Sequence, residues 1–208
     1  MAERRRVVAG AGGFGRELAS FVRSDPAMEW VGFLADEPPS VASATPYLGR
    51  IGDPVAIDVP MLVGVGYPRG KHAVITSAEA AGRSLAPAVV HASATLGPRV
   101  ELAAAVVVGP GAVATIDIAL GRATTVHPGA MLGHDVRCLD YVSIMPGAVI
   151  SGNVTLGQGA FVGANATILQ GVHVGEWATI GAGAVVTRDV APGTTVVGVP
   201  AQARDRQS

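Results

Sequence analysis

The second half of the chain repeats with a period of six. Between Val90 and Val186, every residue at this spacing is Leu, Ile or Val except Ala114 and Cys138. A period of six matches neither the α-helical turn nor the alternation of an ordinary strand. It is typical of a parallel β-helix of hexapeptide repeats, in which three short strands form one coil and small residues turn the corners. Residues at the same position of successive coils then stack above one another.

Composition agrees with this interpretation. The chain has 28 Gly, only 4% aromatic residues and 49% hydrophobic residues. A narrow coil interior has no room for large rings, and so much apolar surface argues against a disordered chain. A sandwich or barrel of short strands would instead need turn signals about every 8–12 residues. The single cysteine, Cys138, excludes an internal disulfide framework and a multi-cysteine zinc site, and it occupies an inward repeat position.

Charge and hydropathy restrict the partners. A net charge of −1 provides no excess of positive charge with which to bind nucleic acid or anionic membranes. The stretch from Tyr141 to Gly175 contains no Asp, Glu, Lys or Arg, but Gly, Pro, Asn, Gln and Ser interrupt it too often for a spanning helix. The basic N-terminus is followed by no apolar segment typical of a signal peptide. We therefore expect a cytoplasmic protein without a membrane span.

Residues 1–86 have a different pattern, which predicts a small α/β, Rossmann-like domain. Three apolar segments read as strands and two segments as helices, one around Leu18–Val22 and one over Lys71–Gly82. The predicted strands are Arg5–Ala9, Trp30–Leu34 and Met61–Val65. We assign residues 87–208 to the β-helix together with a C-terminal cap, because an open coil end would expose unpaired strand edges.

The first predicted strand runs into a glycine-rich turn, Gly10-Ala11-Gly12-Gly13-Phe14-Gly15, and Asp36 comes just after the second predicted strand. This is the G-x-G-x-x-G pattern of nucleotide-binding turns with its ribose-binding acid. Three strands are too few for a complete dinucleotide site, although NAD stays an alternative. We expect a phosphate-binding turn for a nucleotide or nucleotide-sugar, with Gly10, Gly12, Gly13, Phe14 and Asp36 as contacts. The structural alternative is that the glycines only permit a tight turn.

The histidines of the repeats are the candidates for chemistry. His134 precedes Asp135, a carboxylate that can orient an imidazole if the pair lies at a corner, and Gly152 has the same position as His134 one coil further on. From the residues alone, a structural role for His134 stays open. His91 and His127 are two coils apart and therefore in register. They either stack at the surface or take part in a zinc site. In that site His127 and His134 would be two ligands and the third would come from His91 or from a neighbouring chain, which would indicate a metal-dependent hydratase like the β-helical carbonic anhydrases.

The two halves together resemble a known family. The matching segments are Gly10–Glu17, Gly32–Leu34, Val90–Ala94, Gly133–Asp135, Ser151–Val154 and Val197–Ala201. On these motifs the chain resembles the bacterial sugar acetyltransferases that join a small Rossmann-like domain to a left-handed β-helix. That group includes sialic-acid O-acetyltransferases and N-acetyltransferases of nucleotide-linked amino sugars. A non-catalytic nucleotide-binding assembly protein is the remaining alternative.

The resemblance implies a homotrimer with acetyl-CoA as co-substrate and active sites between neighbouring β-helices, without a metal. It implies that His134 is the general base, that Asp135 orients it and that the Gly152 N–H binds the oxyanion. Contacts to acetyl-CoA are expected from Ser143, Gly163, Ala164, Gly181, Ala182 and Arg188. Many members carry His where Phe14 and Ser143 stand. These departures leave open whether the acceptor is an amino sugar or a sialic-acid-like sugar.

Overall fold

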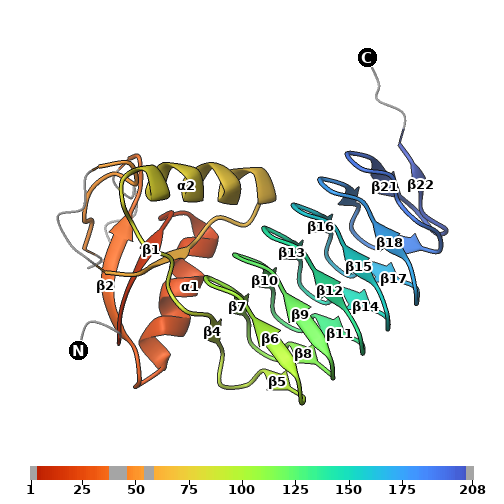
Figure 1. Ribbon diagram of the computed structural model, residues 1–208, viewed down its shortest axis with the longest axis horizontal. Helices are drawn as coiled ribbons and strands as arrows, with labels where there is room; N and C mark the ends of the chain where they lie inside the picture. Colours follow the sequence, from red (N-terminus) through yellow and green to blue (C-terminus); the bar gives the residue numbers. More distant parts are fainter. Residues whose placement is uncertain (1–3, 38–45, 54–58, 205–208) are drawn as a thin grey trace.

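A computed structural model describes residues 4–37, 46–53 and 59–204. The chain forms a small α/β unit followed by a long parallel β-helix, with the two chain ends at opposite ends of the molecule (Figure 1). The α/β unit contains a three-stranded parallel sheet in the order β2-β1-β3. Its strands are β1 (Arg5–Ala9), β2 (Glu29–Leu34) and β3 (Met61–Val63). Its helices are α1 (Gly13–Ser24) and α2 (Pro68–Ala80).

The predicted elements of this unit are all present, with shifted ends. Strand β3 ends at Val63, two residues earlier than expected. Helix α2 begins at Pro68 rather than Lys71 and ends at Ala80 rather than Gly82. Proline suits the first turn of a helix because its fixed φ is helical and its missing N–H has no partner there. The helix therefore starts at the proline.

Each helix contributes to its own apolar cluster with the sheet. Leu18 and Val22 of α1 belong to a cluster with Val8 and Phe33 of the sheet. In α2, Ile75 and Ala78 belong to a second cluster, which includes Val7 and Val63. Neighbouring residues of a strand point to opposite sides, so Val7 and Val8 serve different clusters. The sheet is therefore covered on both faces.

The β-helix has three faces of stacked parallel strands. The first face consists of β4 (Val89–Val90), β7 (Val107–Val108), β10 (Thr125–Val126), β13 (Ser143–Ile144), β16 (Phe161–Val162), β19 (Thr179–Ile180) and β21 (Thr195–Val197). The second face consists of β5 (Thr95–Leu96), β8 (Val113–Ala114), β11 (Met131–Leu132), β14 (Val149–Ile150), β17 (Thr167–Ile168) and β20 (Val185–Val186). The third face consists of β6 (Val100–Leu102), β9 (Ile118–Leu120), β12 (Arg137–Cys138), β15 (Thr155–Leu156) and β18 (His173–Val174).

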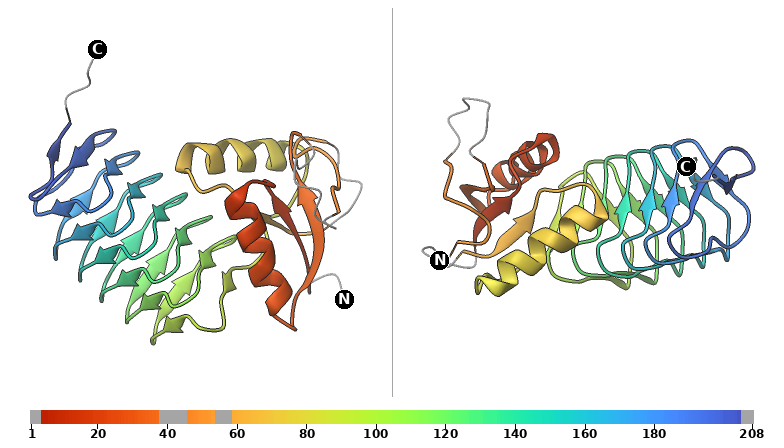
Figure 2. Two further views of the ribbon diagram at one scale, coloured as in Figure 1. Left: turned by 180° about the vertical axis from the view of Figure 1, so that it is seen from behind. Right: turned by 90° about the horizontal axis from the view of Figure 1, so that it is seen from above.

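The faces meet at three corners, which we number in chain order. The first corner lies between the first and second faces, the second corner between the second and third faces, and the third corner between the third face and the first face of the next coil. Strands pair with the equivalent strands of the coils before and after, as expected: Thr125 pairs with Val107 and with Ser143. The right-hand view of Figure 2 shows the coils stacked along one axis. With its hexapeptide repeats and its structural relatives, the coil is of the left-handed type.

The interior of the coil is filled by the residues of the sixfold repeat. Leu132, Ile144 and Ile180 are fully buried, and Cys138 is 3% exposed among them. Burial raises the pKa of the Cys138 thiol to about 12. A thiol held neutral is a poor nucleophile, so Cys138 is a core residue, as predicted.

The last coil is closed by a hairpin. Strand β21 continues the first face, and β22 (Gln202–Ala203) pairs with it in antiparallel fashion. Residues 198–201 form the connection between these strands, and Val197 is the last residue of β21. The connection thereby supplies the cap that the sequence predicts, because it turns the chain back over an otherwise open end of the sheet.

Helix α2 lies along the third corner of the coil, and one buried lysine fixes it there (Figure 1). Lys71 is fully buried, and its Nζ donates to the carbonyl oxygen of Ala123 at 3.1 Å, to Oγ1 of Thr125 at 2.7 Å and to the carbonyl oxygen of Val142 at 2.9 Å. Burial lowers the pKa of Lys71 well below its usual value. Three acceptors satisfy all three donors of an ammonium group. The N-terminal unit is therefore held in one position relative to the coil.

Candidate functional site

His134 and Asp135 lie on the second corner, in the turn between β11 and β12. The distance from His134 Nδ1 to Asp135 Oδ2 is 2.8 Å, and the two side chains are 53% and 57% exposed. Asp135 has a φ of 61°, and this left-handed turn residue lets neighbouring side chains meet. The pair thus lies at a corner, which is the condition under which adjacent side chains of the repeat can meet. A carboxylate on Nδ1 favours the tautomer with the proton there, which leaves Nε2 as the basic nitrogen.

Gly152 lies one coil beyond His134 and directly beneath its ring. A Cβ added to Gly152 would be 2.3 Å from Nε2 and 2.4 Å from Cε1 of His134. Only glycine permits this approach, because real Cβ atoms do not come that close to another heavy atom. Within the described part of the chain, the Gly152 N–H donates no hydrogen bond. A basic nitrogen and an available backbone donor are thus neighbours at this corner.

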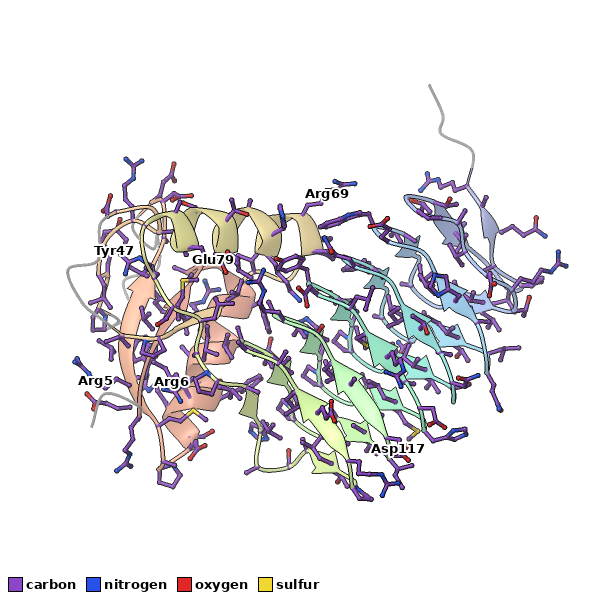
Figure 3. The ribbon with its side chains drawn as sticks, in the orientation of Figure 1. Arg5, Arg6, Tyr47, Arg69, Glu79 and Asp117 are labelled. Atoms are coloured by element: carbon purple, nitrogen blue, oxygen red, sulfur yellow. The ribbon has the colours of Figure 1, made fainter. Side chains whose placement is uncertain are left out.

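The two coils before that of His134 are joined by an ion pair on the same corner. Arg99 and Asp117 pair through two hydrogen bonds, one of them Nη2 to Oδ2 at 2.8 Å. The hydrogen bond from Arg99 lowers the pKa of Asp117. Asp117 lies one coil before Asp135 and marks the second corner in Figure 3. Because Arg99 neutralises Asp117, the carboxylate of Asp135 has no uncompensated negative neighbour from that coil.

The glycine-rich turn meets the β-helix at the first corner, on the other edge of the second face. The ring of Phe14 lies 4.7 Å from the ring of His127, centroid to centroid. His127 is 5% exposed, and its Nε2 has no hydrogen-bond partner among the described residues. Burial, and secondarily the charge of Lys71, lower the pKa of His127 to about 4. This histidine is therefore neutral at pH 7.

These positions bear on the zinc alternative. His127 and His134 lie on different corners, and Nδ1 of His91 is 2.9 Å from the hydroxyl of Ser93. In the described ranges, no three His, Cys, Asp or Glu side chains converge as a metal site would require. A zinc site within one chain is accordingly not supported.

The low pKa of His127 predicts a pH dependence of stability. The unfolded chain binds a proton near pH 6.5, whereas the folded chain binds it near pH 4. Stability from this group is therefore complete above pH 6.5 and is lost as the pH falls towards 4. We expect the wild type to lose up to about 3 kcal/mol more than His127→Gln between pH 7 and pH 4. Urea denaturation at several pH values measures this difference, and parallel curves for the two proteins would contradict it.

The glycine-rich turn itself has two kinds of glycine. A Cβ on Gly15 would lie 1.8 Å from the carbonyl oxygen of Gly10, so Gly15 is needed for the tight turn. Gly12 and Gly13 have no heavy atom within 4 Å of an added Cβ among the described residues. Their small size is not demanded by packing, and it leaves the N-terminal end of α1 open. Asp36 follows β2, at the same carboxyl edge of the sheet, and is exposed.

The residues expected to contact acetyl-CoA fall into three groups. Gly163 and Gly181 are stacked on the first corner, since a Cβ on Gly163 would lie 2.5 Å from the nitrogen of Ala182. Arg188 lines a pocket of 560 Å³ beside the C-terminal cap. Ser143 is fully buried, and its hydroxyl donates to the carbonyl oxygen of Gly66 at 2.7 Å. Ser143 thus connects the two parts of the chain and is not open to a ligand here.

The outer side of the second face is largely apolar, with Thr95 of β5 and Thr167 of β17 as its polar positions. Met131 and Val149 point outward from neighbouring strands and are 47% and 38% exposed. Val113 and Val185 occupy the same outward position in β8 and β20 and are half-buried. We call these four residues the apolar strip. It lies between the first corner, with His127, and the second corner, with His134.

Comparison with known proteins agrees with this architecture. The family model described as bacterial transferase hexapeptide (six repeats) matches residues 135–170 and 153–188. A search of curated protein sequences gives no match. In the described part of the chain, no helix combines the length and the apolarity needed to cross a bilayer.

Several solved structures match nearly the whole chain. Perosamine N-acetyltransferase from Caulobacter crescentus, in complex with CoA and GDP-perosamine, is 25% identical with a TM-score of 0.86, and 96% of each chain is covered. The acetyltransferase domain of PglB from Neisseria gonorrhoeae, in complex with acetyl coenzyme A, is 28% identical with a TM-score of 0.74, covering 97% of this chain and 99% of that one. WeeI from Acinetobacter baumannii is 25% identical with a TM-score of 0.84, covering 96% and 99%. With its hexapeptide repeats and this full-length similarity, the chain resembles bacterial sugar acetyltransferases, which are acyltransferases, over nearly its whole length.

Proposed function

We propose that the protein transfers the acetyl group of acetyl-CoA to the amine of a nucleotide-linked amino sugar. The main support for this proposal is the arrangement at the second corner, where Asp135 orients His134 and the His134 ring lies over the open backbone of Gly152. The similar Caulobacter enzyme holds CoA together with GDP-perosamine, which supports this substrate class. We assign the binding of the nucleotide-sugar to a Rossmann-like domain, residues 1–86, and the chemistry to residues 87–208.

In this mechanism His134 Nε2 removes a proton from the attacking amine while the nitrogen bonds to the thioester carbonyl carbon. Asp135 stabilises the imidazolium that forms, as a carboxylate on the other ring nitrogen does in hydrolase triads. The Gly152 N–H donates to the developing oxyanion, a contribution that strengthens as charge builds on the oxygen. His134 then returns the proton to the departing thiolate of CoA, and the products are an amide and free CoA.

In this proposal the glycine-rich turn binds the acceptor substrate. We assign Gly10, Gly12, Gly13, Phe14 and Asp36 to the nucleotide-sugar. The unoccupied space above Gly12 and Gly13 supports this, because α1 begins there with free N–H groups and a positive dipole end. On the donor side we assign Gly163, Ala164, Gly181, Ala182 and Arg188 to acetyl-CoA and leave out Ser143, whose hydroxyl is already bonded to Gly66.

A complete site requires a second copy of the chain. Within one chain the glycine-rich turn lies at the first corner and His134 at the second corner, with the whole second face between them. We propose a homotrimer in which the first corner of one copy faces the second corner of the next. The exposed apolar strip supports burial of this face against another copy. Since acetyl-CoA is the co-substrate, we place the enzyme in the cytoplasm.

A thiol-release screen tests the proposed substrate class. Purified protein is incubated with acetyl-CoA and one acceptor at a time: GDP-, UDP- and dTDP-linked amino sugars, the same sugars without nucleotide, and sialic acids. We expect CoA release with at least one nucleotide-linked amino sugar and much slower release with the corresponding free sugar. Release only with sialic acids would instead assign O-acetylation, and release with none of them would contradict the proposed acceptor class.

A further inference from the structure

One pocket has no role in the proposed mechanism. It has a volume of about 430 Å³ and lies between the beginning of α2 and the third corner of the coil. The residues that line it are Tyr67, Pro68, Arg69, Gly159, Phe161, Trp177 and Thr179. Figure 3 shows Arg69 and Asp117 on opposite edges of the molecule, so the pocket is far from the corner that carries His134 and Asp135.

Three aromatic rings line the pocket. The chain has nine aromatic residues (2 Trp, 3 Tyr and 4 Phe), and three of them line this pocket. The rings of Tyr67 and Phe161 are stacked with centroids 5.3 Å apart and planes inclined by 11°. Tyr67 is nevertheless 72% exposed, so its second face is open to solvent. Tyr67 therefore presents an open aromatic face at the pocket, on which a flat ring can stack.

The ring of Trp177 holds the cation of the pocket. The guanidinium carbon of Arg69 lies 5.0 Å from the centroid of this ring. A Cβ on Gly159 would lie 2.2 Å from the Trp177 ring, so glycine is required for the ring to lie here. His72 approaches the same ring edge-on, with centroids 5.9 Å apart. The ring and the guanidinium are therefore held in place before any ligand arrives.

The pocket is positive. Of the described residues, none that lines it carries a carboxylate, and none forms an ion pair with Arg69. A planar guanidinium with free N–H groups matches the geometry of a phosphate. Aromatic faces are sequence-tolerant stacking platforms for nucleobases. A neutral sugar would satisfy the rings but leave the cation without a partner.

We propose that this pocket is a nucleotide subsite, in which the base stacks on the open face of Tyr67 and a phosphate pairs with Arg69. The proposal rests on the proposed function only for the source of the nucleotide. That reaction offers two sources with the same chemistry, the nucleotide handle of the acceptor and the adenosine phosphate of CoA. The pocket is a different place from the glycine-rich turn, which contacts the coil at the first corner.

Calorimetric titration of the full-length protein tests this proposal without turnover. The ligands are GDP, UDP and adenosine 3′,5′-bisphosphate, with guanosine as the form lacking phosphate. We expect Tyr67→Ala to weaken the binding of one of these nucleotides by about 10-fold or more, and Tyr67→Phe to retain it, because stacking needs the ring and not the hydroxyl. Arg69→Gln is expected to weaken the binding of that nucleotide and to leave the affinity for guanosine, which has no phosphate, unchanged. If the variants weaken the binding of GDP or UDP, the pocket binds the nucleotide of the acceptor. If they weaken the binding of the bisphosphate, it binds the adenosine phosphate of CoA.

The matched control is Arg23→Ala. Arg23 lies over the ring of Trp30 at 5.7 Å, a cation–aromatic pair of the same kind on α1, and its loss should leave nucleotide affinity unchanged. Equal affinity of wild type, Tyr67→Ala and Arg69→Gln for all three nucleotides would overturn the proposal. So would wild-type affinity for guanosine equal to that for whichever nucleotide responds to Tyr67→Ala. Calorimetry measures binding directly, so the proposed subsite and the proposed acetyl transfer are tested independently. Nucleotide binding that depends on Tyr67, without CoA release for any acceptor, would support the subsite and contradict the acetyl transfer.

Discussion

Replacing His134 with alanine is expected to lower turnover with acetyl-CoA and the best acceptor by about 10²- to 10⁴-fold, the usual effect of losing a general base. The amine must lose a proton as it bonds to the carbonyl carbon, and in our assignment Nε2 of His134 is the nitrogen that accepts it. The side chain is 53% exposed and bonded to Asp135, so its removal should leave the coil intact. Initial rates of thiol release measure the effect, with a thermal melt as the check on folding.

His173→Ala is the matched control for this variant. His173 is another exposed histidine on the β-helix, in β18 of the third face, and has no place in the proposed chemistry. We expect its turnover to stay within about 2-fold of wild type, as for a surface substitution away from any special feature. Near-normal turnover of His134→Ala would refute the role of base and return this residue to the structural role that the sequence left open.

The second large effect is expected at Gly152. An alanine methyl there would lie 2.3 Å from His134 Nε2, so the imidazole must move away from its position over the corner. Displacing the base and crowding the oxyanion donor together should lower turnover by about 10²- to 10³-fold, the range for loss of one such donor. Affinity for acetyl-CoA, measured by titration, should fall much less.

A double variant separates this steric effect from a general loss of stability. The three atoms nearest to the added methyl all belong to His134. In the His134→Ala background the clash is absent, so Gly152→Ala should cost little further stability, and the two effects on unfolding should be non-additive. If Gly152→Ala lowers stability equally with and without His134, the close approach of ring and glycine does not exist in solution.

Much of the coil was predictable, because the sixfold spacing of its aliphatic residues can be read directly from the sequence. Aliphatic residues at every sixth position all face one interior when the chain winds into a coil of three faces. Leu132, Ile144 and Ile180 are fully buried there, which confirms the prediction. The same register predicts that Gly152 stacks on His134. The corner position of the His134–Asp135 pair follows as well, since it falls between two repeat strands. Periodicity thus predicted the geometry of the corner but not its chemistry.

The contacts between the N-terminal unit and the coil were not predictable. Lys71 is 71 residues from Val142, and no local pattern indicates that a lysine on α2 will be buried against that carbonyl. The burial of Ser143 against Gly66 was unpredictable for the same reason, because these two residues are 77 positions apart in the chain. The pocket between Tyr67 and Trp177 also joins distant segments. Its one sequence signal is the rarity of aromatic residues, which makes three of them in one place unusual.

The glycine-rich turn was interpreted in two ways, and its glycines differ in their surroundings. Gly15 fits the structural alternative, because its close approach to Gly10 allows no side chain. Gly12 and Gly13 have free space around them, which suits an approaching phosphate. A motif alone does not distinguish these cases, because both require the same residue type.

The most direct test of the account is the mass of the reaction product. Wild-type protein is incubated with acetyl-CoA and the acceptor that gives the fastest thiol release, and the sugar is analysed by mass spectrometry. We expect a sugar that has gained one acetyl group on its amine, formed in equal amount to the CoA released, and almost none of it with His134→Ala. CoA release without an acetylated sugar, or the same yield of acetylated sugar from His134→Ala, would contradict the account.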